Sequence, residues 1–366
     1  MTSEKRPRRP RWSYVSRWPY VSRWSYVSRR PYVSRRSHTS RRSGRLHGWG
    51  GVSTMAGACA LTAALALPQL PHAATERSER AAQRTATAVP AQTDACTDPE
   101  PVPPSDDNNA PGVKAIRDRQ GSARKLVVGV DQNSYRWGSR NPDTGELEGF
   151  DIDLAKAIAA DILGSERDIT FRAIPTEQRE KALAEGTVDL VVRTMTITCE
   201  RSEKVTFSTP YFQVGQQVLV PKGSPVTGFD ETLRGKRVCT ARKSTAYTAL
   251  KKKSYGAVFD KPEYIVANQL DCLVRLQLGE VDAVVTDNAL AAGQAAQDPD
   301  VELVGEPLPP EYYGVAAELG NDDLVGRVNH VLEEYRAGGK DSRWMKSYNN
   351  WLKAGLPGIT EPPVVD

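Results

Sequence analysis

The chain has 366 residues, 26% of them charged, and a formal net charge of +4. This small total combines two parts of opposite net charge. Residues 1–50 contain 14 Lys and Arg and one acidic residue. The other 316 residues contain 35 Lys and Arg and 44 Asp and Glu. The N-terminal arm therefore carries +13 and the remainder −9. An acidic body argues against nucleic-acid binding, because phosphate contacts need clustered Lys and Arg. The length allows two domains plus tails.

The N-terminal 74 residues form no predicted domain. An Arg-aromatic hexad repeats from Arg11 to Ser43, without a period that would give a helix or strand a buried face. It is either an arm that binds anionic polymers or translated repeats upstream of the true start codon, and we favour the second. A basic stretch, a short apolar run and small residues near Ala73 then predict an export signal. A lipid anchor stays open, since Cys59 lacks the leucine preferred before it.

Two similar series of strands and helices follow a predicted disordered tether. The first runs from a buried strand at 126–130 to another at 188–192. Each series closes with a helix, a glycine and Val-Asp, at Gly186 and again at Gly279, 93 residues apart. This alternation predicts parallel sheets with a site at the carboxyl ends of their strands.

Extended segments at 207–215 and 312–317 predict two crossovers between these series. Two crossovers make a hinge, so we expect an α/β protein of two lobes. The predicted parts are a repeat arm and export signal (1–74), a disordered tether (75–122), the first part of lobe 1 (123–212), lobe 2 (213–310), the return to lobe 1 (311–354) and a tail (355–366).

The cysteines predict disulfides in an exported body. If Cys59 leaves with the signal, four remain, and an even number outside the cell favours pairing. Four cysteines allow three pairings; we predict Cys239–Cys272 because both lie in one lobe, which leaves Cys96–Cys199. A metal site is disfavoured, since there is no Cys-x-x-Cys pair.

Two charged residues suggest the ligand class. Arg201 lies in the first turn of a predicted helix, where the helix dipole disfavours a cation, and its guanidinium could hold a carboxylate with two hydrogen bonds. Asp287 follows the strand at 281–286 and could pair with an ammonium or cap the next helix. A cation and an anion on separate α/β units fit the two ends of a free amino acid. Thr194 and Thr196 precede Arg201 on one face of an extended segment.

The chain resembles the family 3 extracellular solute-binding proteins of polar amino-acid ABC importers. The resemblance covers residues 123–354 and is closest to the actinobacterial glutamine/glutamate-type proteins. It rests on Gly-Phe-Asp-Ile-Asp-Leu-Ala (149–155), Thr-Ile-Thr-Cys-Glu-Arg (196–201), Phe-Ser-Thr-Pro-Tyr-Phe (207–212) and Gly-Glu-Val-Asp-Ala (279–283). It implies a two-lobed periplasmic-binding-protein-like fold (type II, venus flytrap), a free polar amino acid as ligand and a membrane permease as partner.

Further site residues follow from the resemblance. Ser244 and Thr245 are similar to the family's carboxylate-binding turn at a helix N-terminus. Lys243 stands where the family often has glycine, so it either blocks a close backbone approach, adds a positive charge near an acidic side chain, or is simply an exposed lysine. Trp137 and Tyr135 are candidates for an apolar wall over the ligand. Arg193 could bind a side-chain carboxylate or carboxamide, or lie at a solvated edge.

We therefore expect a non-catalytic binding protein for the Glu, Gln, Asp and Asn class, exported to the outer face of the cytoplasmic membrane or secreted, monomeric and without cofactor. An amino-acid sensor that feeds a signalling partner would have the same site. An enzyme on this scaffold, a dehydratase or glycan-cleaving protein, is disfavoured because catalysis needs a positioned acid or base. No His is predicted in the cleft, and Glu177 is the nearest spare carboxylate.

Overall fold

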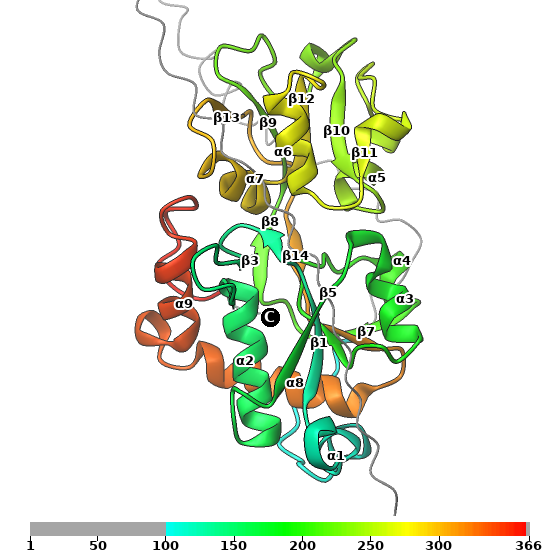
Figure 1. Ribbon diagram of the computed structural model, residues 1–366, viewed down its shortest axis with the longest axis vertical. Helices are drawn as coiled ribbons and strands as arrows, with labels where there is room; N and C mark the ends of the chain where they lie inside the picture. Colours follow the sequence, from blue (N-terminus) through cyan, green and yellow to red (C-terminus); the bar gives the residue numbers. More distant parts are fainter. Residues whose placement is uncertain (1–99, 364–366) are drawn as a thin grey trace, which may run out of the picture. The chain divides into compact units, whose positions relative to one another are not determined.

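Two five-stranded sheets organise the part of the chain that the structure, a computed structural model, describes, residues 100–363 (Figure 1). The predictions for the repeat arm, the export signal, Cys59 and Cys96 fall outside these residues.

The first sheet defines the first lobe and has the order β5-β1-β6-β15-β7. Its strand β1 (Leu126–Val130) runs parallel to β5 (Ile169–Ala173) and β6 (Leu190–Val191). The late strand β15 (Ala316–Glu318) inserts antiparallel between β6 and β7 (Val205–Phe207). The sheet is therefore completed by a segment more than 100 residues downstream.

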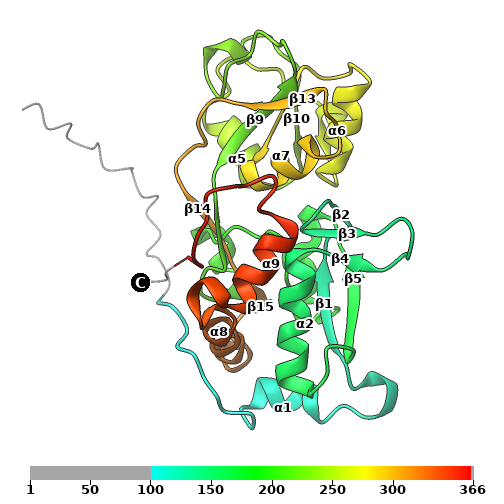
Figure 2. The same ribbon diagram turned by 90° about the vertical axis from the view of Figure 1, so that its left-hand side faces the viewer.

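Helices cover both faces of this sheet. The larger core packs α2 (Phe150–Leu163), α8 (Asp322–Arg336) and α9 (Arg343–Trp351) against it, and Figure 2 shows these three helices side by side. The short helix α3 (Arg179–Ala184) packs in a smaller cluster on the other face, preceded by the 3-10 turn η2 (Thr176–Gln178). A small sheet of β2 (Asn133–Ser134), β3 (Gly138–Arg140) and β4 (Leu147–Glu148) lies between β1 and α2 in sequence.

The second sheet defines the second lobe and has the order β11-β10-β12-β9-β13. Its strands are β9 (Gln216–Pro221), β10 (Val238–Ala241), β11 (Ile265–Val266), β12 (Ala283–Asp287) and β13 (Val301–Val304). Helix α5 (Thr245–Lys252) packs in one core, while α6 (Leu270–Gln277) and α7 (Asn288–Ala295) contribute to the other. The 3-10 turns η3 (Glu231–Leu233) and η4 (Pro262–Tyr264) complete this lobe. Cys239 of β10 and Cys272 of α6 form a disulfide, which confirms that predicted pair.

The aspartates of the two Val-Asp motifs accept equivalent hydrogen bonds in the two lobes. Asp189 accepts two hydrogen bonds from the Arg119 guanidinium, at 2.6 and 2.8 Å, and a third from Val127 N. Asp282 accepts two from the Arg237 side chain, at 2.6 and 3.1 Å, and a third from Arg237 N. Each carboxylate thus fixes the start of its strand to the neighbouring strand.

The lobes are connected by two paired strands. β8 (Phe212–Val214) and β14 (Glu311–Tyr313) run antiparallel, with Phe212 opposite Tyr313 and Val214 opposite Glu311. Thr196 also pairs with Tyr313 in an isolated bridge, so the segment before Arg201 lies against the returning crossover.

The end of the predicted tether is folded, in contrast to the expectation for 75–122. Helix α1 (Pro111–Arg117) buries Val113 and Ile116, and a 3-10 turn, η1 (Gly121–Ala123), follows it. Two further bonds hold the chain before α1 to α8: Ser105 N donates to Gly326 O, and the Asn329 side chain donates to Val102 O. The Pro-rich composition suggested disorder, yet regularly spaced apolar residues anchor this stretch.

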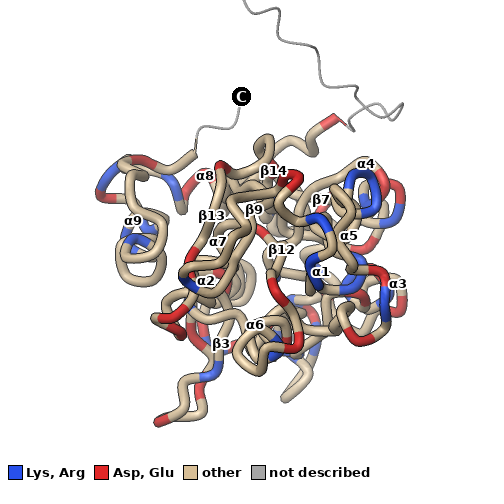
Figure 3. The backbone as a smooth tube through the Cα atoms, turned by 90° about the horizontal axis from the view of Figure 1, so that it is seen from above, with Lys and Arg blue, Asp and Glu red and all other residues tan. Residues whose placement is uncertain are grey.

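The remaining described elements are α4 (Cys199–Ser202) and η5 (Gly339–Asp341). Between residues 100 and 363, the structure has no helix of the length and apolarity that a membrane crossing requires. Acidic and basic residues are interspersed along α3 and α4 (Figure 3).

Candidate ligand-binding site

A small cavity lies where strands of both lobes end. β6 of the first lobe leads into Arg193–Thr196, whereas β10 and β12 of the second lobe lead into Ser244 and Asp287. Its volume is about 20 Å³, close to the space of one water molecule. The lining residues are Asp131, Thr176, Arg179, Arg193, Thr194, Thr196, Arg201, Ala241, Ser244, Thr245, Gln269, Thr286, Asp287 and Leu290.

Arg201 is buried at this cavity and links the two lobes. It lies in the four-residue helix α4, whose first turn is capped by the Thr198 hydroxyl. Its guanidinium donates to Thr196 O of its own lobe at 2.7 Å and to Lys243 O of the second lobe at 3.0 Å. Only 6% of the residue is exposed, and burial lowers the pKa of its side chain. Both bonds go to carbonyl oxygens, and among residues 100–363 no anion is bonded directly to this positive charge.

Asp287 approaches from the other lobe at the end of β12. Its carboxylate makes no capping bond to α7; it accepts instead from the Gln216 side-chain amide and, at 2.5 Å, from the Tyr313 hydroxyl. Burial raises the pKa of this carboxyl, while the two hydrogen bonds and the charge of Arg201 oppose that shift. A buried carboxylate beside a buried guanidinium could hold the two charged ends of an amino acid.

Arg193 lines the cavity but is already paired. Its Nη2 lies 2.8 Å from Asp131 Oδ2, with both side chains at most 5% exposed, and its Nη1 donates to the Thr176 hydroxyl. Asp131 also accepts from the Ser134 hydroxyl and from two backbone N–H groups. The alternative of a solvated edge residue is wrong for Arg193.

The two predicted threonines both reach the cavity. Thr194 has a φ of 40°, and its N–H donates to the buried Asp151 carboxylate at 2.9 Å. The Thr196 hydroxyl donates to Glu311 of the crossover strand β14, while its carbonyl accepts from Arg201. The loop between β6 and α4 is thus held from both sides.

The turn before α5 contributes Ser244 and Thr245. The Ser244 hydroxyl caps α5 by accepting from Tyr247 N and donates to Ala241 O. The Thr245 hydroxyl accepts from the Gln216 amide at 2.9 Å. Lys243 has a φ of 57°, a left-handed conformation that glycine adopts without strain.

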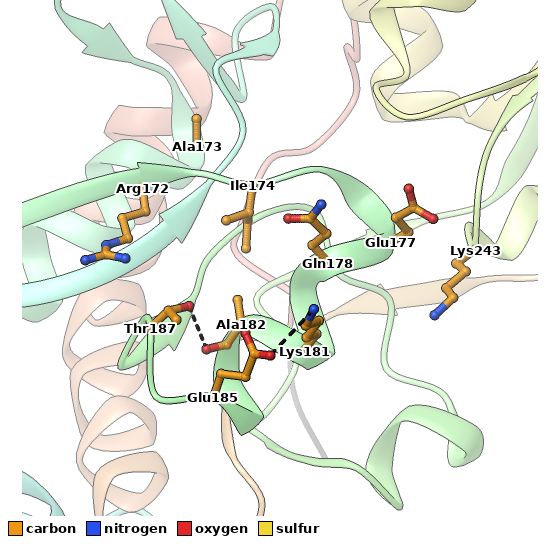
Figure 4. A pocket seen from close by; sticks show the side chains of 10 residues that line it. All are labelled: Arg172, Ala173, Ile174, Glu177, Gln178, Lys181, Ala182, Glu185, Thr187 and Lys243. Atoms are coloured by element: carbon orange, nitrogen blue, oxygen red, sulfur yellow. Dashed lines mark hydrogen bonds and ion pairs between the residues drawn. The ribbon is translucent and has the colours of Figure 1, made fainter.

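The Lys243 side chain lies outside the cavity. It lines an open groove beside it, opposite Glu177 and Lys181 of the η2–α3 segment (Figure 4). Only its backbone carbonyl takes part in the site, through Arg201. Glu177 pairs with Arg242 of the second lobe at 3.4 Å.

The predicted aromatic wall is not part of the cavity. Trp137 is 1% exposed and packs edge-on against Phe212 and Tyr313, with its Nε1 donating to Ala289 O. Tyr135 is 38% exposed and lines a separate small depression. Trp137 belongs to an aromatic core, because its ring packs against Phe150, Phe212 and Tyr313 where the crossovers meet the first sheet. Leu290 and Ala241 supply the apolar lining instead.

Sequence reasoning missed two charged residues at the site. Arg179 begins α3 and is 4% exposed, although its Arg-Glu-Lys setting resembles a solvated helix. Glu311 on β14 accepts from Thr196 and from Gln216, and burial and the Asp287 charge raise the pKa of its carboxyl. Arg179, Ala182 and Leu183 share a buried helix face, and this spacing could have indicated that Arg179 is buried. No pattern in the sequence indicates Glu311.

Comparisons with known proteins show what this chain is similar to. Residues 126–354 match the model of the bacterial extracellular solute-binding proteins, family 3. The ABC transporter glutamine-binding protein GlnH of Bacillus subtilis is 36% identical over 239 residues, 65% of this chain and 84% of that protein. The glutamate-binding protein GluB of Corynebacterium efficiens is 29% identical over 248 residues, 64% of this chain and 83% of that protein.

Solved structures give the same result. An ancestral arginine-binding protein bound to glutamine is 37% identical, with a TM-score of 0.57, over 64% of this chain and 99% of that one. A solute receptor for L-cysteine of Neisseria gonorrhoeae is 28% identical, with a TM-score of 0.58, over 66% of this chain and 94% of that one. The predicted two-lobed α/β fold is confirmed. The chain belongs to the family 3 bacterial extracellular solute-binding proteins.

Proposed function

We propose that the chain captures a free polar amino acid of the Glu, Gln, Asp and Asn class outside the cytoplasm and delivers it to an ABC permease. The observation that carries this proposal is the cavity in which Arg201 of one lobe and Asp287 of the other are both buried. Arg201 would bind the α-carboxylate and Asp287 the α-ammonium. Relatives named for glutamine and glutamate binding support the ligand class.

Capture requires the lobes to move. A cavity of about 20 Å³ is too small for an amino acid, and the bonds from Arg201 to Lys243 O and from Trp137 to Ala289 O cross between the lobes. The ligand would enter with the lobes apart and be enclosed as they rotate about β8 and β14. A single chain supplies both halves of the site, so we propose a monomer as the working unit.

Calorimetric titration of the full chain with the four amino acids tests the proposal. At least one should bind at a single site. Replacing Arg201 with alanine removes two charge-assisted hydrogen bonds to the carboxylate, about 1.5–3 kcal/mol each, so Kd should rise at least ~100-fold. Arg343→Ala, which removes an exposed arginine paired with Glu166, is the matched control and should bind normally. Unaltered binding by Arg201→Ala would exclude this carboxylate site.

A further inference from the structure

One stretch of the second lobe carries a strong positive charge. Residues 234–261 contain nine Lys and Arg and a single acidic residue, Asp260. The rest of residues 51–366 contains 26 Lys and Arg against 43 Asp and Glu, a net of −17. The charge of this acidic body is therefore strongly uneven, and the second lobe has a basic region that composition alone does not reveal.

The lysines of this stretch lie on three adjoining segments. The segment before β10 is hydrogen-bonded to the turn after α5, where Gly235 N donates to Gly256 O at 2.8 Å. The Tyr247 hydroxyl of α5 donates to Asp260 at 3.1 Å, which joins the helix to the segment that leads to β11. Because β10 and β11 are parallel neighbours, their starts lie at the same edge of the second sheet (Figure 1). We call the lysines of these segments the lysine surface: Lys236, Lys251, Lys252, Lys253 and Lys261.

Half-buried tyrosine rings support three of these exposed lysines. The distances from the lysine Nζ to the ring centroid are 5.5 Å for Lys251 and Tyr247, 4.4 Å for Lys253 and Tyr255, and 5.7 Å for Lys261 and Tyr264. Among residues 100–363, no carboxylate forms an ion pair with Lys251, Lys253 or Lys261. A cation–π contact holds the lysine stem on the ring and leaves the ammonium accessible to solvent.

Nearby acidic residues do not neutralise the lysine surface. Two arginines before β10 are paired with carboxylates, Arg234 with Glu231 and Arg237 with Asp282. The five lysines are then offset only by Asp260 and Glu263 in the same segments, which leaves a net charge of +3. The dipole of α5 favours basic residues in its last turn, but it does not account for Lys236 and Lys261 on the neighbouring segments.

The lysine surface lies away from the ligand cavity. Ser244, which caps the start of α5, lines the cavity, whereas Lys251 and Lys252 end the helix. Eight helical residues span about 12 Å, so a helix length separates these lysines from the site. A partner bound to the lysine surface would therefore leave the cleft free to bind its ligand.

We propose that the lysine surface binds the anionic headgroups of a membrane. Lysines supported by tyrosine rings suit a lipid–water interface, because the ring lies among the headgroups while the ammonium contacts phosphate. Each lysine near an anionic bilayer strengthens attachment about fivefold. The acidic remainder of the body would be repelled, so this face of the second lobe would turn toward the bilayer. The inference goes beyond the proposed function and does not depend on which amino acid is bound.

Sedimentation of the full chain with lipid vesicles tests this proposal. Vesicles of phosphatidylcholine with phosphatidylglycerol should bind about tenfold or more tightly than vesicles of phosphatidylcholine alone, and added salt should weaken that binding. The triple variant Lys251→Gln, Lys253→Gln, Lys261→Gln should bind the anionic vesicles about tenfold or more weakly. The same three changes to arginine keep the charge and should retain the binding.

A second triple variant controls for the loss of charge. Lys340→Gln, Lys346→Gln, Lys353→Gln alters three exposed lysines of the first lobe and should leave vesicle binding within about twofold. The N-terminal arm is present in every variant and cannot create a difference between them. Thermal unfolding checks that both variants fold. The single changes Lys251→Gln and Lys346→Gln repeat the comparison with one charge each, and only the first should weaken binding, about fivefold.

Three results would overturn the proposal. Equal binding to vesicles with and without phosphatidylglycerol would exclude recognition of anionic headgroups. An equal loss of binding in the two triple variants would assign the attraction to net charge or to the arm. Binding to immobilised polyglutamate that depends on the lysine surface, without binding to the vesicles, would assign this surface to an acidic polypeptide instead.

Discussion

Asp287→Asn should separate binding from stability. The amide has the shape of the carboxylate and can keep both neighbours: its oxygen accepts from the Gln216 amide, while its nitrogen donates to the Tyr313 hydroxyl, which can accept as well as donate. Both neighbours keep a hydrogen bond to residue 287, although the Tyr313 O–H gives up its acceptor. The substitution removes the negative charge, which burial disfavours and which the ligand's ammonium would need.

The size of the two effects follows from these contacts. Loss of one charge-assisted hydrogen bond costs about 1.5–3 kcal/mol, so Kd should rise about ten- to 150-fold. Without ligand, the thermal midpoint at neutral pH should stay the same or increase. Because the pKa of Asp287 is raised in the folded state, its contribution to stability is present at low pH and is lost as the pH rises through that pKa. The asparagine variant lacks this loss.

Calorimetry and thermal unfolding of the same samples measure both effects. Asp282→Asn is the matched control, since it alters an aspartate of the same lobe whose partner is Arg237 rather than a ligand. It should lower the midpoint and leave Kd unchanged. An Asp287→Asn protein that binds within twofold of the unaltered chain would refute the assignment of the ammonium.

Three further outcomes are expected. Burial raises the pKa of Asp151 to about 7, so stability should decline between about pH 4 and pH 7 as the unfolded state loses its proton first, and denaturant titrations of Asp151→Asn should show a flatter profile in that window. Lys243→Gly should raise the free energy of unfolding by up to about 1 kcal/mol, because glycine adopts a φ of 57° without strain; an unchanged midpoint in urea would contradict this. Replacing both Cys239 and Cys272 with alanine removes a disulfide across a sequence separation of 33 and should cost about 3–4 kcal/mol, measured in the same way against the oxidised unaltered chain.

The fold could be predicted further from the sequence than the site could. The order of strands and helices and the 93-residue repeat follow from local patterns of apolar residues, glycines and strand-starting aspartates. The buried strand predicted at 126–130 coincides with β1. Local patterns also place Arg201 and Asp287 at the ends of their elements.

Partner choice among buried charges could not be predicted in this way. Arg193 and Asp131 are 62 positions apart, and only the folded sheet brings them to 2.8 Å. The local sequence predicts Arg179 as a solvated helix residue. It is buried because its guanidinium donates to the carbonyl oxygens of Arg193 and Thr194, which follow β6. Trp137 resembles a ligand-facing ring, but its position depends on where the two crossovers meet the first sheet. The Cys96–Cys199 pair stays a prediction, because Cys96 lies outside the described residues.

The path of the chain between the lobes has a mechanical consequence. Within residues 100–363 the backbone passes between the lobes at β8 and β14, and the stretch at residues 102–105 is hydrogen-bonded to α8 of the first lobe. Near the other end, the Tyr348 hydroxyl of α9 donates to Leu356 O, so the last described segment is also held there. Both flanks are therefore held by the first lobe, and rotation of the second lobe about β8 and β14 would leave these contacts in place.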